Sequence, residues 1–306
     1  MNFLIVGPGA MGCLFAASLK KAGYPVTLLD NIEERAQKIN AQGIFVEGIK
    51  GKFNVKVPAV TGGPAFIPDA VLICVKSNDT RDAGLAAKPW TGPGTLILTL
   101  QNGIGNMETL KEIFGNRKVL GGVTSEGATL LDWGRIRHAG RGETIIGPGG
   151  ISDNILEKIV TAYNRAGFQT RLEDDVESLL WGKLIINVGI NALAAITRLK
   201  NGCLPDIQGT RLIMERAVSE AVEIAEKKGI ELPYPDPMER VINVCRSTSG
   251  NIASMLQDVL NNKITEIDFI NGAIVREGNA VGTNAYTNMF LTSLVQSIQE
   301  SYEKRV

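Results

Sequence analysis

Apolar and polar positions follow two different spacings along the chain. Up to about residue 150, short runs of consecutive apolar residues end in turn signals, which is typical of strands buried on both faces of a parallel sheet. Beyond Gly149 the apolar residues recur with the period of a helix. The pattern therefore predicts an α/β, Rossmann-like doubly wound sheet in residues 1–172 and an all-α domain in residues 173–306.

The individual elements follow from the same pattern. Strands are expected at residues 2–6, 24–29, 69–75 and 95–100, with a helix at 13–22. Residues 118–147 look like several short strands, some of them antiparallel, that complete the sheet. The segment 168–174 is expected to link the halves, and the proline-rich segment 232–237 to interrupt the helical half. Helices are expected there at residues 152–166, 174–198, 205–228, 236–245, 249–260, 264–281 and 287–303.

A glycine-rich segment follows the first predicted strand and fits the pattern G-x-G-x-x-G. In a dinucleotide-binding βαβ unit, the first glycine permits a tight turn and the second lets the backbone approach the pyrophosphate at a helix N-terminus. The third glycine allows close packing of helix on strand. The strand before the pattern and the helix after it predict a dinucleotide site, with cofactor-binding residues Gly7, Gly9, Ala10, Met11 and Gly12.

An acidic residue, Asp30, ends the second predicted strand. A carboxylate at this position accepts hydrogen bonds from the ribose 2′-hydroxyl of NAD and repels the 2′-phosphate of NADP. No arginine follows it directly, and Arg35 lies on the next helix. The position therefore favours NAD(H).

Polar residues also follow the third and fourth predicted strands. Lys76 comes after the strand at 69–75, and Asn102 after the strand at 95–100. Ligands of open α/β sheets bind at the carboxyl ends of strands, so both residues are candidate cofactor contacts. The alternative for Asn102 is a simple turn residue, because Asn-Gly is a strong turn signal.

The predicted helix at 174–198 carries three polar residues on one face. Lys183, Asn187 and Asn191 are spaced by four, while nearly every residue around them is apolar. A buried lysine without a partner is costly, so its pKa shifts or it meets a carboxylate or a ligand. The alternative is a lysine that reaches the domain surface, with two amides bonded to neighbouring backbone.

Composition narrows the possible chemistry. Lys+Arg and Asp+Glu balance at 32 each, so no nucleic-acid or membrane partner is expected. The single histidine, His138, lies in a turn-rich segment and is expected at the surface, which disfavours Ser-His-Asp or two-histidine zinc chemistry. No metal site is predicted. The four scattered cysteines fit reduced thiols in a cytoplasm, and the N-terminus resembles no signal peptide.

Two further polar groups lie in the helical half. Asn251 and Ser254 are expected on one face of the helix at 249–260. Glu266 lies beside apolar residues near the start of the next predicted helix, which Thr265 is placed to cap. A role at the helix start is therefore the alternative to a catalytic role for Glu266.

Six motifs occur together in a particular order: the N-terminal G-x-G-x-x-G, Val75-Lys76, Gln101-Asn102-Gly103, Trp181-x-Lys183-Leu184-x-x-Asn187-x-x-x-Asn191, Ser254-Met255-Leu256-Gln257-Asp258 and Thr265-Glu266-Ile267-Asp268-x-x-Asn271-Gly272. With them the chain resembles the ketopantoate reductase (2-dehydropantoate 2-reductase) family over nearly its whole length. The resemblance implies reduction of 2-dehydropantoate to (R)-pantoate by a nicotinamide cofactor, a step toward pantothenate and coenzyme A.

The resemblance also implies roles for individual residues. It makes Lys183 the general acid and Glu266 the residue that orients the substrate and supports catalysis. Lys76 and Asn102 match positions near the nicotinamide. The positions that match substrate contacts are Asn187, Asn191, Asn201, Asn251 and Ser254.

The chain departs from the family at two places. Residues 281–286 read V-G-T-N-A-Y where the family usually has V-P-T-P-x-N, which bears on the local turn. The family mostly uses NADPH and commonly has a basic residue after the second strand, where this chain has Asp30-Asn31. The resemblance thus implies NADP(H), while Asp30 leaves NAD(H) open.

Two other functions remain as alternatives. One is a related dehydrogenase for another small 2-oxo or 3-hydroxy acid. The other is a non-catalytic nicotinamide-binding sensor, which would be free to lose Lys183 or Glu266. The apolar helical half permits a homodimer without requiring one.

Overall fold

The computed structural model describes residues 1–147 and 153–304, so residue 152, the expected start of one helix, lies outside the described residues. The chain divides into two compact units. The first unit comprises Met1–Gln101 and Asn106–Val176, and the second comprises Asn102–Gly105 and Glu177–Val306. The division thus falls after Val176, where the sequence pattern had suggested residue 172, and a short segment after the fourth predicted strand belongs to the helical unit.

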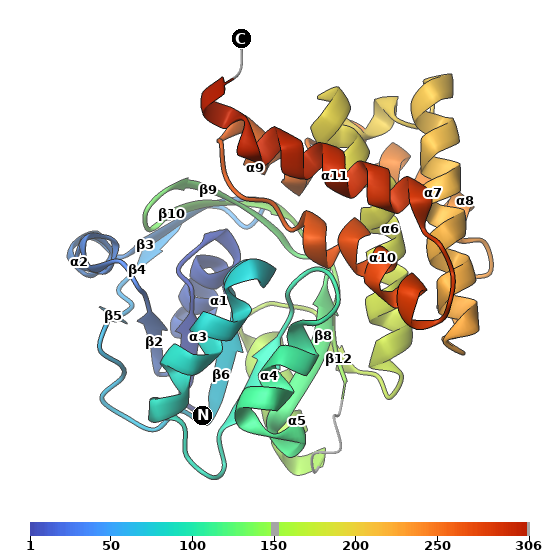
Figure 1. Cartoon of the computed structure of the whole chain (residues 1–306). Coiled ribbons are helices and arrows are strands. Elements are labelled where there is room, and N and C mark those ends of the chain that lie inside the picture. Colours follow the sequence, from blue (N-terminus) through green and yellow to red (C-terminus); the bar gives the residue numbers. More distant parts are fainter. Residues whose placement is uncertain (148–152, 305–306) are drawn as a thin grey trace. The chain divides into compact units, whose positions relative to one another are not determined.

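The first unit is built on an eight-stranded sheet (Figure 1). Neighbouring strands pair in parallel except β11, which runs antiparallel to β8. The order reverses at β1, which pairs with both β2 and β6, and ligands of such sheets bind at the carboxyl ends beside this reversal. The strands in spatial order are β12 (Thr170–Leu172), β11 (Thr144–Ile146), β8 (Val119–Thr124), β7 (Leu96–Thr99), β6 (Ala70–Ile73), β1 (Phe3–Val6), β2 (Val26–Leu29) and β5 (Ala59–Val60).

Both faces of this sheet are buried. Alternate residues of β1 point to opposite faces, so Phe3 and Ile5 belong to one apolar cluster and Leu4 and Val6 to another. The first cluster includes residues of α1 (Ala10–Lys21), α2 (Glu33–Gln42) and α5 (Asp153–Arg165). The second includes residues of α3 (Thr80–Ala87) and α4 (Asn106–Phe114). Burial on both sides explains why these strands read as continuous apolar runs.

A second, four-stranded sheet also lies in the first unit, in the order β4 (Phe53–Val55), β3 (Ile44–Gly48), β10 (Arg135–Gly140) and β9 (Gly127–Asp132). Helix α1 contacts all four of these strands. The prediction that residues 118–147 complete one sheet was therefore only partly right, because β8 and β11 join the large sheet while β9 and β10 form the small one. The segment 168–174, expected to be a link, contains β12.

The second unit is helical and has its own apolar core. Its helices are α6 (Val176–Thr197), α7 (Gln208–Lys227), α8 (Pro237–Ser247), α9 (Ser254–Leu260), α10 (Asn271–Ala280) and α11 (Tyr286–Glu300). Two predicted starts were wrong, because α9 begins at Ser254 rather than 249 and α10 at Asn271 rather than 264. Short 3₁₀ turns in the chain are η1 (Ser77–Asp79), η2 (Lys88–Trp90), η3 (Asn116–Lys118), η4 (Asn201–Cys203), η5 (Ile267–Phe269) and η6 (Tyr302–Lys304).

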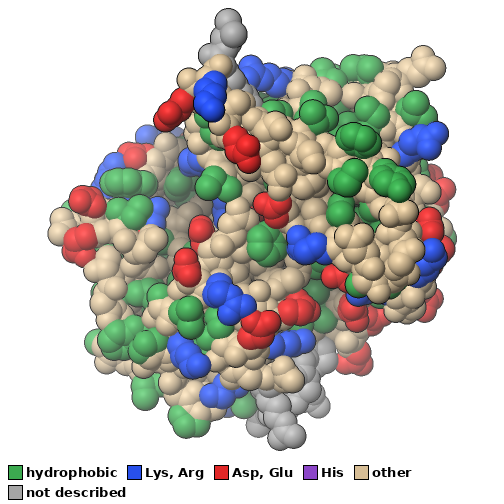
Figure 2. Space-filling model, in the orientation of Figure 1, with side chains coloured by type: hydrophobic (Ala, Val, Ile, Leu, Met, Phe, Trp, Pro, Cys, Tyr) green, Lys and Arg blue, Asp and Glu red, His purple; other side chains and the backbone are tan. Residues whose placement is uncertain are grey.

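Helix α6 is long and apolar enough to cross a membrane by length and composition alone. However, 67% of its most apolar 18-residue stretch is buried within the protein. The core helix of a soluble protein meets the same criteria. On the face of the molecule that Figure 2 shows, basic and acidic side chains are interspersed.

Candidate active site

The glycine loop after β1 is shaped by close backbone contacts. Gly7 has a φ of +95°, and a Cβ there would lie 2.6 Å from Val75 Cγ1. A Cβ on Gly12 would lie 2.0 Å from the Gly7 carbonyl oxygen. Gly9 differs, because among the described residues nothing lies within 4 Å of the position its Cβ would take. Packing thus requires Gly7 and Gly12, whereas Gly9 leaves open space over the start of α1.

The start of α1 suits an anion. Gly9 is the N-cap residue and provides no side-chain cap, and no acidic residue lies in the first turn, where Ala10 and Met11 follow. The first backbone N–H groups of a helix lack intrahelical partners and attract negative charge. Together with the open space at Gly9, this geometry fits the pyrophosphate of a dinucleotide.

Asp30 lies beside this loop. The Gly7 N–H donates to the Leu29 carbonyl over 3.0 Å, which brings the carboxyl end of β2 next to the turn. The Asp30 side chain is buried and forms an ion pair with Arg35. The residue predicted to meet the cofactor ribose therefore lies at the end of β2 beside the glycine loop and is paired with a cation.

Lys76, which is half-buried, begins a loop held by a network of polar side chains. Asn106 Nδ2 donates to Ser77 Oγ over 3.1 Å, and Thr80 Oγ1 donates to Asn106 Oδ1 over 2.8 Å. Gln101 Nε2 donates to Thr80 Oγ1 and to the Val75 carbonyl. The loops that follow β6 and β7 are thus joined by hydrogen bonds on both sides of Lys76.

In the second unit, Lys183 lies half-buried on α6. Burial lowers the pKa of its ammonium group to about 8, and the carboxylate of Glu266 acts in the opposite direction. Glu266 also accepts a long hydrogen bond of 3.3 Å from Asn102 Nδ2. The structure therefore groups three residues that the sequence singled out separately, and it places Asn102 in the unit that holds Lys183.

The Asn102–Glu266 contact depends on close packing of two turns. Gly103 has a φ of +79°, and a Cβ there would lie 2.2 Å from the Phe269 carbonyl oxygen, which also accepts the Ile104 N–H. Thr265 Oγ1 accepts the Ile267 N–H over 3.2 Å at the start of η5. The expected cap by Thr265 of a long helix was wrong, since Glu266 precedes a single 3₁₀ turn and α10 begins later.

Asn187 and Asn191 continue the polar face of α6 toward its C-terminus. Asn191 is buried, and Asn187 is half-buried. Asn187 Nδ2 is inaccessible to solvent and has no hydrogen-bond partner in residues 1–147 and 153–304. Because such a donor costs free energy when unpaired, this amide is a candidate ligand contact.

The other predicted substrate residues form a separate group. Asn201 donates its backbone N–H to the Asn251 carbonyl over 3.1 Å and its Nδ2 to Thr248 Oγ1 over 3.0 Å. Asn201 Oδ1 is buried without a partner in the described part of the chain. Asn251 and Ser254 are exposed. The prediction that these two share a helix face was wrong, because Asn251 precedes α9.

Comparison with known proteins finds family models that match both parts of the chain. Residues 3–150 match the family model described as "Ketopantoate reductase PanE/ApbA", and residues 175–299 match its C-terminal counterpart. The chain belongs to the ketopantoate reductase family.

Individual proteins are similar to this chain over all or nearly all of their lengths. A 2-dehydropantoate 2-reductase of Pyrococcus horikoshii is 37% identical over 97% of both chains. A ketopantoate reductase of Ralstonia eutropha JMP134 matches with a TM-score of 0.92 and 34% identity over 99% of this chain and 100% of that one. A D-mandelate dehydrogenase solved with NADH and anilino(oxo)acetate matches with a TM-score of 0.92 and 25% identity over 100% of both chains.

Two groups of contacts in this ketopantoate reductase fold were not predicted from the sequence. A buried network joins Asn271, Asn288 and Glu220 across four helices. The proline-rich segment packs on α6, where Tyr234 donates to the Gly182 carbonyl over 2.5 Å.

His138 was predicted wrongly as a surface residue. It lies in β10 with 2% of its surface exposed, and its Nε2 is 2.5 Å from Glu126 Oε2. The glycines on either side of His138 suggested a loop at the surface. The segment between them is instead a strand whose side chain at His138 points inward. The only histidine is therefore part of a buried structural pair.

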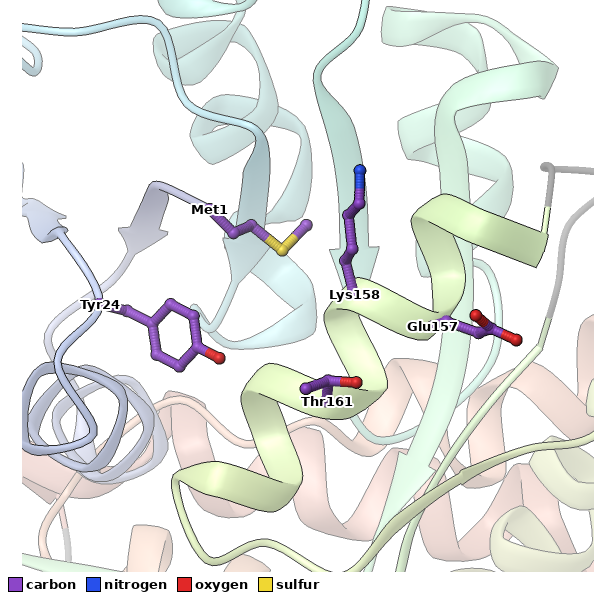
Figure 3. A pocket seen from close by; sticks show the side chains of 5 residues that line it. All are labelled: Met1, Tyr24, Glu157, Lys158 and Thr161. Carbon is purple, nitrogen blue, oxygen red and sulfur yellow. The ribbon is translucent and has the colours of Figure 1, made fainter.

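One cavity of the first unit lies away from the edge of the sheet where a nucleotide would bind. A hollow of about 280 Å³ is lined by Met1 and Tyr24 and by three residues of α5 (Figure 3). Met1 and Tyr24 precede β1 and β2, so this hollow lies at the amino ends of the strands. Dinucleotides bind such sheets at the opposite edge.

The open space at Gly9 gives a direct test of cofactor binding. We expect Gly9→Ala to fold normally and to raise the dissociation constant of the dinucleotide by about tenfold, or about 1.4 kcal/mol, since the methyl group would occupy pyrophosphate space. Titration followed by nucleotide fluorescence measures this. Gly94→Ala is the matched control, because nothing lies within 4 Å of that Cβ position either. Equal affinities for the two variants would contradict the assignment.

Proposed function

We propose that this protein reduces 2-dehydropantoate to (R)-pantoate with a nicotinamide cofactor, a step of pantothenate biosynthesis. The observation that carries the proposal is the Lys183 ammonium, which lies on an apolar helix with its pKa lowered to about 8 and the Glu266 carboxylate acting on it. Membership of the ketopantoate reductase family supports the same reaction. A cytoplasmic location and a homodimer stay predictions.

The chemistry requires an acid at the carbonyl oxygen. When bound, the nicotinamide cofactor supplies the reducing equivalent to the carbonyl carbon, and negative charge develops on the oxygen. The Lys183 ammonium stabilises that charge and donates the proton that completes the hydroxyl group. Burial suits lysine to this work, because it brings the pKa closer to neutrality than that of an exposed lysine.

The neighbouring residues would orient the substrate. Glu266 holds a substrate hydroxyl or the Lys183 ammonium in line, and its contact with Asn102 restricts the carboxylate. Asn187 Nδ2, which has no partner among the described residues, offers a donor to a substrate oxygen. Neutral donors from Asn191, Asn201, Asn251 and Ser254 would bind the substrate carboxylate in place of an arginine.

The cofactor residues would act from the glycine loop. Gly7, Gly9, Ala10, Met11 and Gly12 would hold the pyrophosphate at the start of α1, and Asp30 would lie beside the adenosine ribose. Lys76, whose loop is held by the Ser77–Asn106–Thr80 network, would lie toward the nicotinamide.

The lowered pKa of Lys183 predicts the pH dependence of reduction. Only the protonated amine can donate, so kcat should fall by about tenfold per pH unit above pH 8. Since the Glu266 carboxylate raises the pKa of Lys183, Glu266→Gln should move this fall to lower pH. The measurement is kcat against pH for the wild type and for Glu266→Gln, with exposed Glu231→Gln as control. A shift to higher pH in Glu266→Gln would refute the coupling.

A second candidate is a dehydrogenase for another small 2-oxo acid. The likeness to D-mandelate dehydrogenase, with a TM-score of 0.92, favours it because that protein was solved with an oxo-acid ligand and NADH. Both reactions would use the same lysine and differ in the group attached to the keto acid.

Steady-state assays decide between the two candidates. Nicotinamide absorbance would be followed with 2-dehydropantoate, benzoylformate and smaller 2-oxo acids, each with NADH and with NADPH. We expect kcat/KM to be highest for 2-dehydropantoate. A higher value for another acid would support the second candidate, and no turnover with any acid would refute both.

A further inference from the structure

Arg35 is held by Asp30 at the carboxyl end of β2. Its Nε donates to Asp30 Oδ2 over 2.7 Å and its Nη2 to Oδ1 over 2.5 Å, which is a bidentate ion pair. Nη2 also donates to Asn31 Oδ1 over 3.2 Å. The Asp30 side chain has no exposed surface, and that of Arg35 is 19% exposed. Two of the three guanidinium nitrogens of Arg35, Nε and Nη2, therefore donate to its own chain.

The pair lies next to the glycine loop. Backbone hydrogen bonds join Gly7 to Leu29 and Asp30 to Val60, which fixes the end of β2 on both sides. Cys13, near the start of α1, also lies close enough to the ion pair for both charges to act on its thiol. Burial raises the pKa of its thiol to about 12, the Arg35 charge opposes this rise and the Asp30 charge adds to it. The ion pair therefore lies where the adenosine ribose of a dinucleotide bound at this loop would be recognised.

The other charges nearby are acidic or already paired. Glu33 and Glu34 occupy the first turn of α2, and Glu33 accepts a hydrogen bond from Thr61. Lys38, one turn beyond Arg35, forms an ion pair with Asp132. A ribose 2′-phosphate would bring close to two negative charges to this edge and would have to compete with Asp30 for Arg35.

We propose that Asp30 makes this protein prefer NADH over NADPH by keeping Arg35 from the 2′-phosphate. The preference rests on the nicotinamide cofactor of the proposed function. Among the described residues, Asp30 Oδ1 accepts from the Ile32 N–H and Arg35 Nη2, and Oδ2 accepts from Arg35 Nε, so the carboxylate is committed to its own chain. A 2′-phosphate would meet the Asp30 carboxylate as a like charge, whereas a ribose hydroxyl carries no charge that the carboxylate would repel.

The structure makes a specific variant informative. Asp30→Asn removes the charge but keeps an oxygen for the Ile32 N–H, so the turn into α2 is retained. Arg35 is then released at the place where a 2′-phosphate would lie. We expect this one substitution to move the ratio of NADPH to NADH affinity toward NADPH by at least about tenfold, which corresponds to about 1.4 kcal/mol. Adding Arg35→Gln should abolish that gain, because the gain is attributed to the released guanidinium and the neighbouring Lys38 is paired with Asp132.

The experiment is equilibrium binding of NADH and NADPH, without keto acid, followed by nucleotide fluorescence. The samples are the wild type, Asp30→Asn, Asp30→Asn with Arg35→Gln, and the exposed-site control Lys52→Ala, with thermal unfolding of each. The proposal requires that the wild type bind NADH more tightly than NADPH. It also requires that Asp30→Asn move the affinity ratio toward NADPH, and that this change be lost when Arg35→Gln is added. Tighter NADPH binding by the wild type, or an unchanged ratio in Asp30→Asn, overturns it.

The proposed function fails on different results. If the wild type binds neither nucleotide, both proposals are overturned. If it binds NADH more tightly but turns over no keto acid, only the proposed reaction is overturned. If it reduces 2-dehydropantoate and prefers NADPH, only the cofactor preference is overturned.

Discussion

Replacing Lys183 by alanine is expected to lower kcat for keto-acid reduction by about three orders of magnitude, the combined effect of losing a general acid and a charge at the developing oxyanion. The amine has a pKa lowered to about 8 by burial, so it can give up its proton near neutral pH. Initial rates at saturating cofactor and substrate measure the loss. The affinity for dinucleotide should stay unchanged, because the glycine loop belongs to the other unit.

Two further variants identify what the lysine does. Lys183→Arg keeps the positive charge, but a guanidinium holds its proton too tightly to donate it. We therefore expect its kcat to lie above that of Lys183→Ala and below that of the wild type, without the fall of kcat above pH 8. Exposed Lys52→Ala should behave as the wild type. Near-normal turnover by Lys183→Ala would show that the acid is elsewhere.

The fold of the first unit was largely predictable because its central strands are buried on both faces. Runs such as Leu4, Ile5 and Val6 have no polar face and read directly as strands. The small sheet was harder, because β10 alternates exposed and buried residues between glycine turns. Such a short alternating strand does not reveal which sheet it joins.

The helix starts were mispredicted for a related reason. Apolar residues at 252 and 264 extend the helical spacing, yet Ile252 and Ile264 are exposed and lie outside helices. Periodicity treats any apolar residue as buried. The segments before α9 and α10 are instead held by turns, whose hydrogen bonds leave no periodic signal.

The part of the candidate site that lies on a single helix was predictable from the sequence. Spacing by four on α6 indicated Lys183, Asn187 and Asn191 as a polar face. The contact between Glu266 and Asn102 joins distant parts of the chain, so spacing along one element could not predict it. The family resemblance indicated Glu266 as a catalytic residue but Asn102 as a cofactor contact. Its tie to Glu266 depends on the packing of Gly103 against Phe269.

The largest expected effect on stability comes from Asn288, which is fully buried on α11. Its Nδ2 donates to the Ala217 carbonyl over 3.0 Å and to Glu220 Oε2 over 2.8 Å, and its Oδ1 accepts Asn271 Nδ2 over 2.9 Å. Glu220 in turn accepts the Thr287 and Asn288 N–H groups at the start of α11. One amide thus joins α7, α10 and α11.

Asn288→Ala should destabilise the protein by about 2 kcal/mol or more, because it leaves the Asn271 amide and the Ala217 carbonyl buried with a lost partner. This corresponds to a Tm lowered by about 4–8 °C for a unit of this size. Thermal unfolding followed by circular dichroism measures it. Asn284→Ala is the control, since Asn284 is exposed near the start of the same helix, and its Tm should not change.

The same substitution should also lower kcat, although less than loss of Lys183. Asn271 Nδ2 donates to the Val188 carbonyl of α6, and α10 begins shortly after Glu266. The network therefore sets the position of the Glu266 turn relative to the helix that carries Lys183. If Asn288→Ala lowers Tm but leaves both kcat and its pH dependence at the wild-type values, the network stabilises the unit without positioning Glu266.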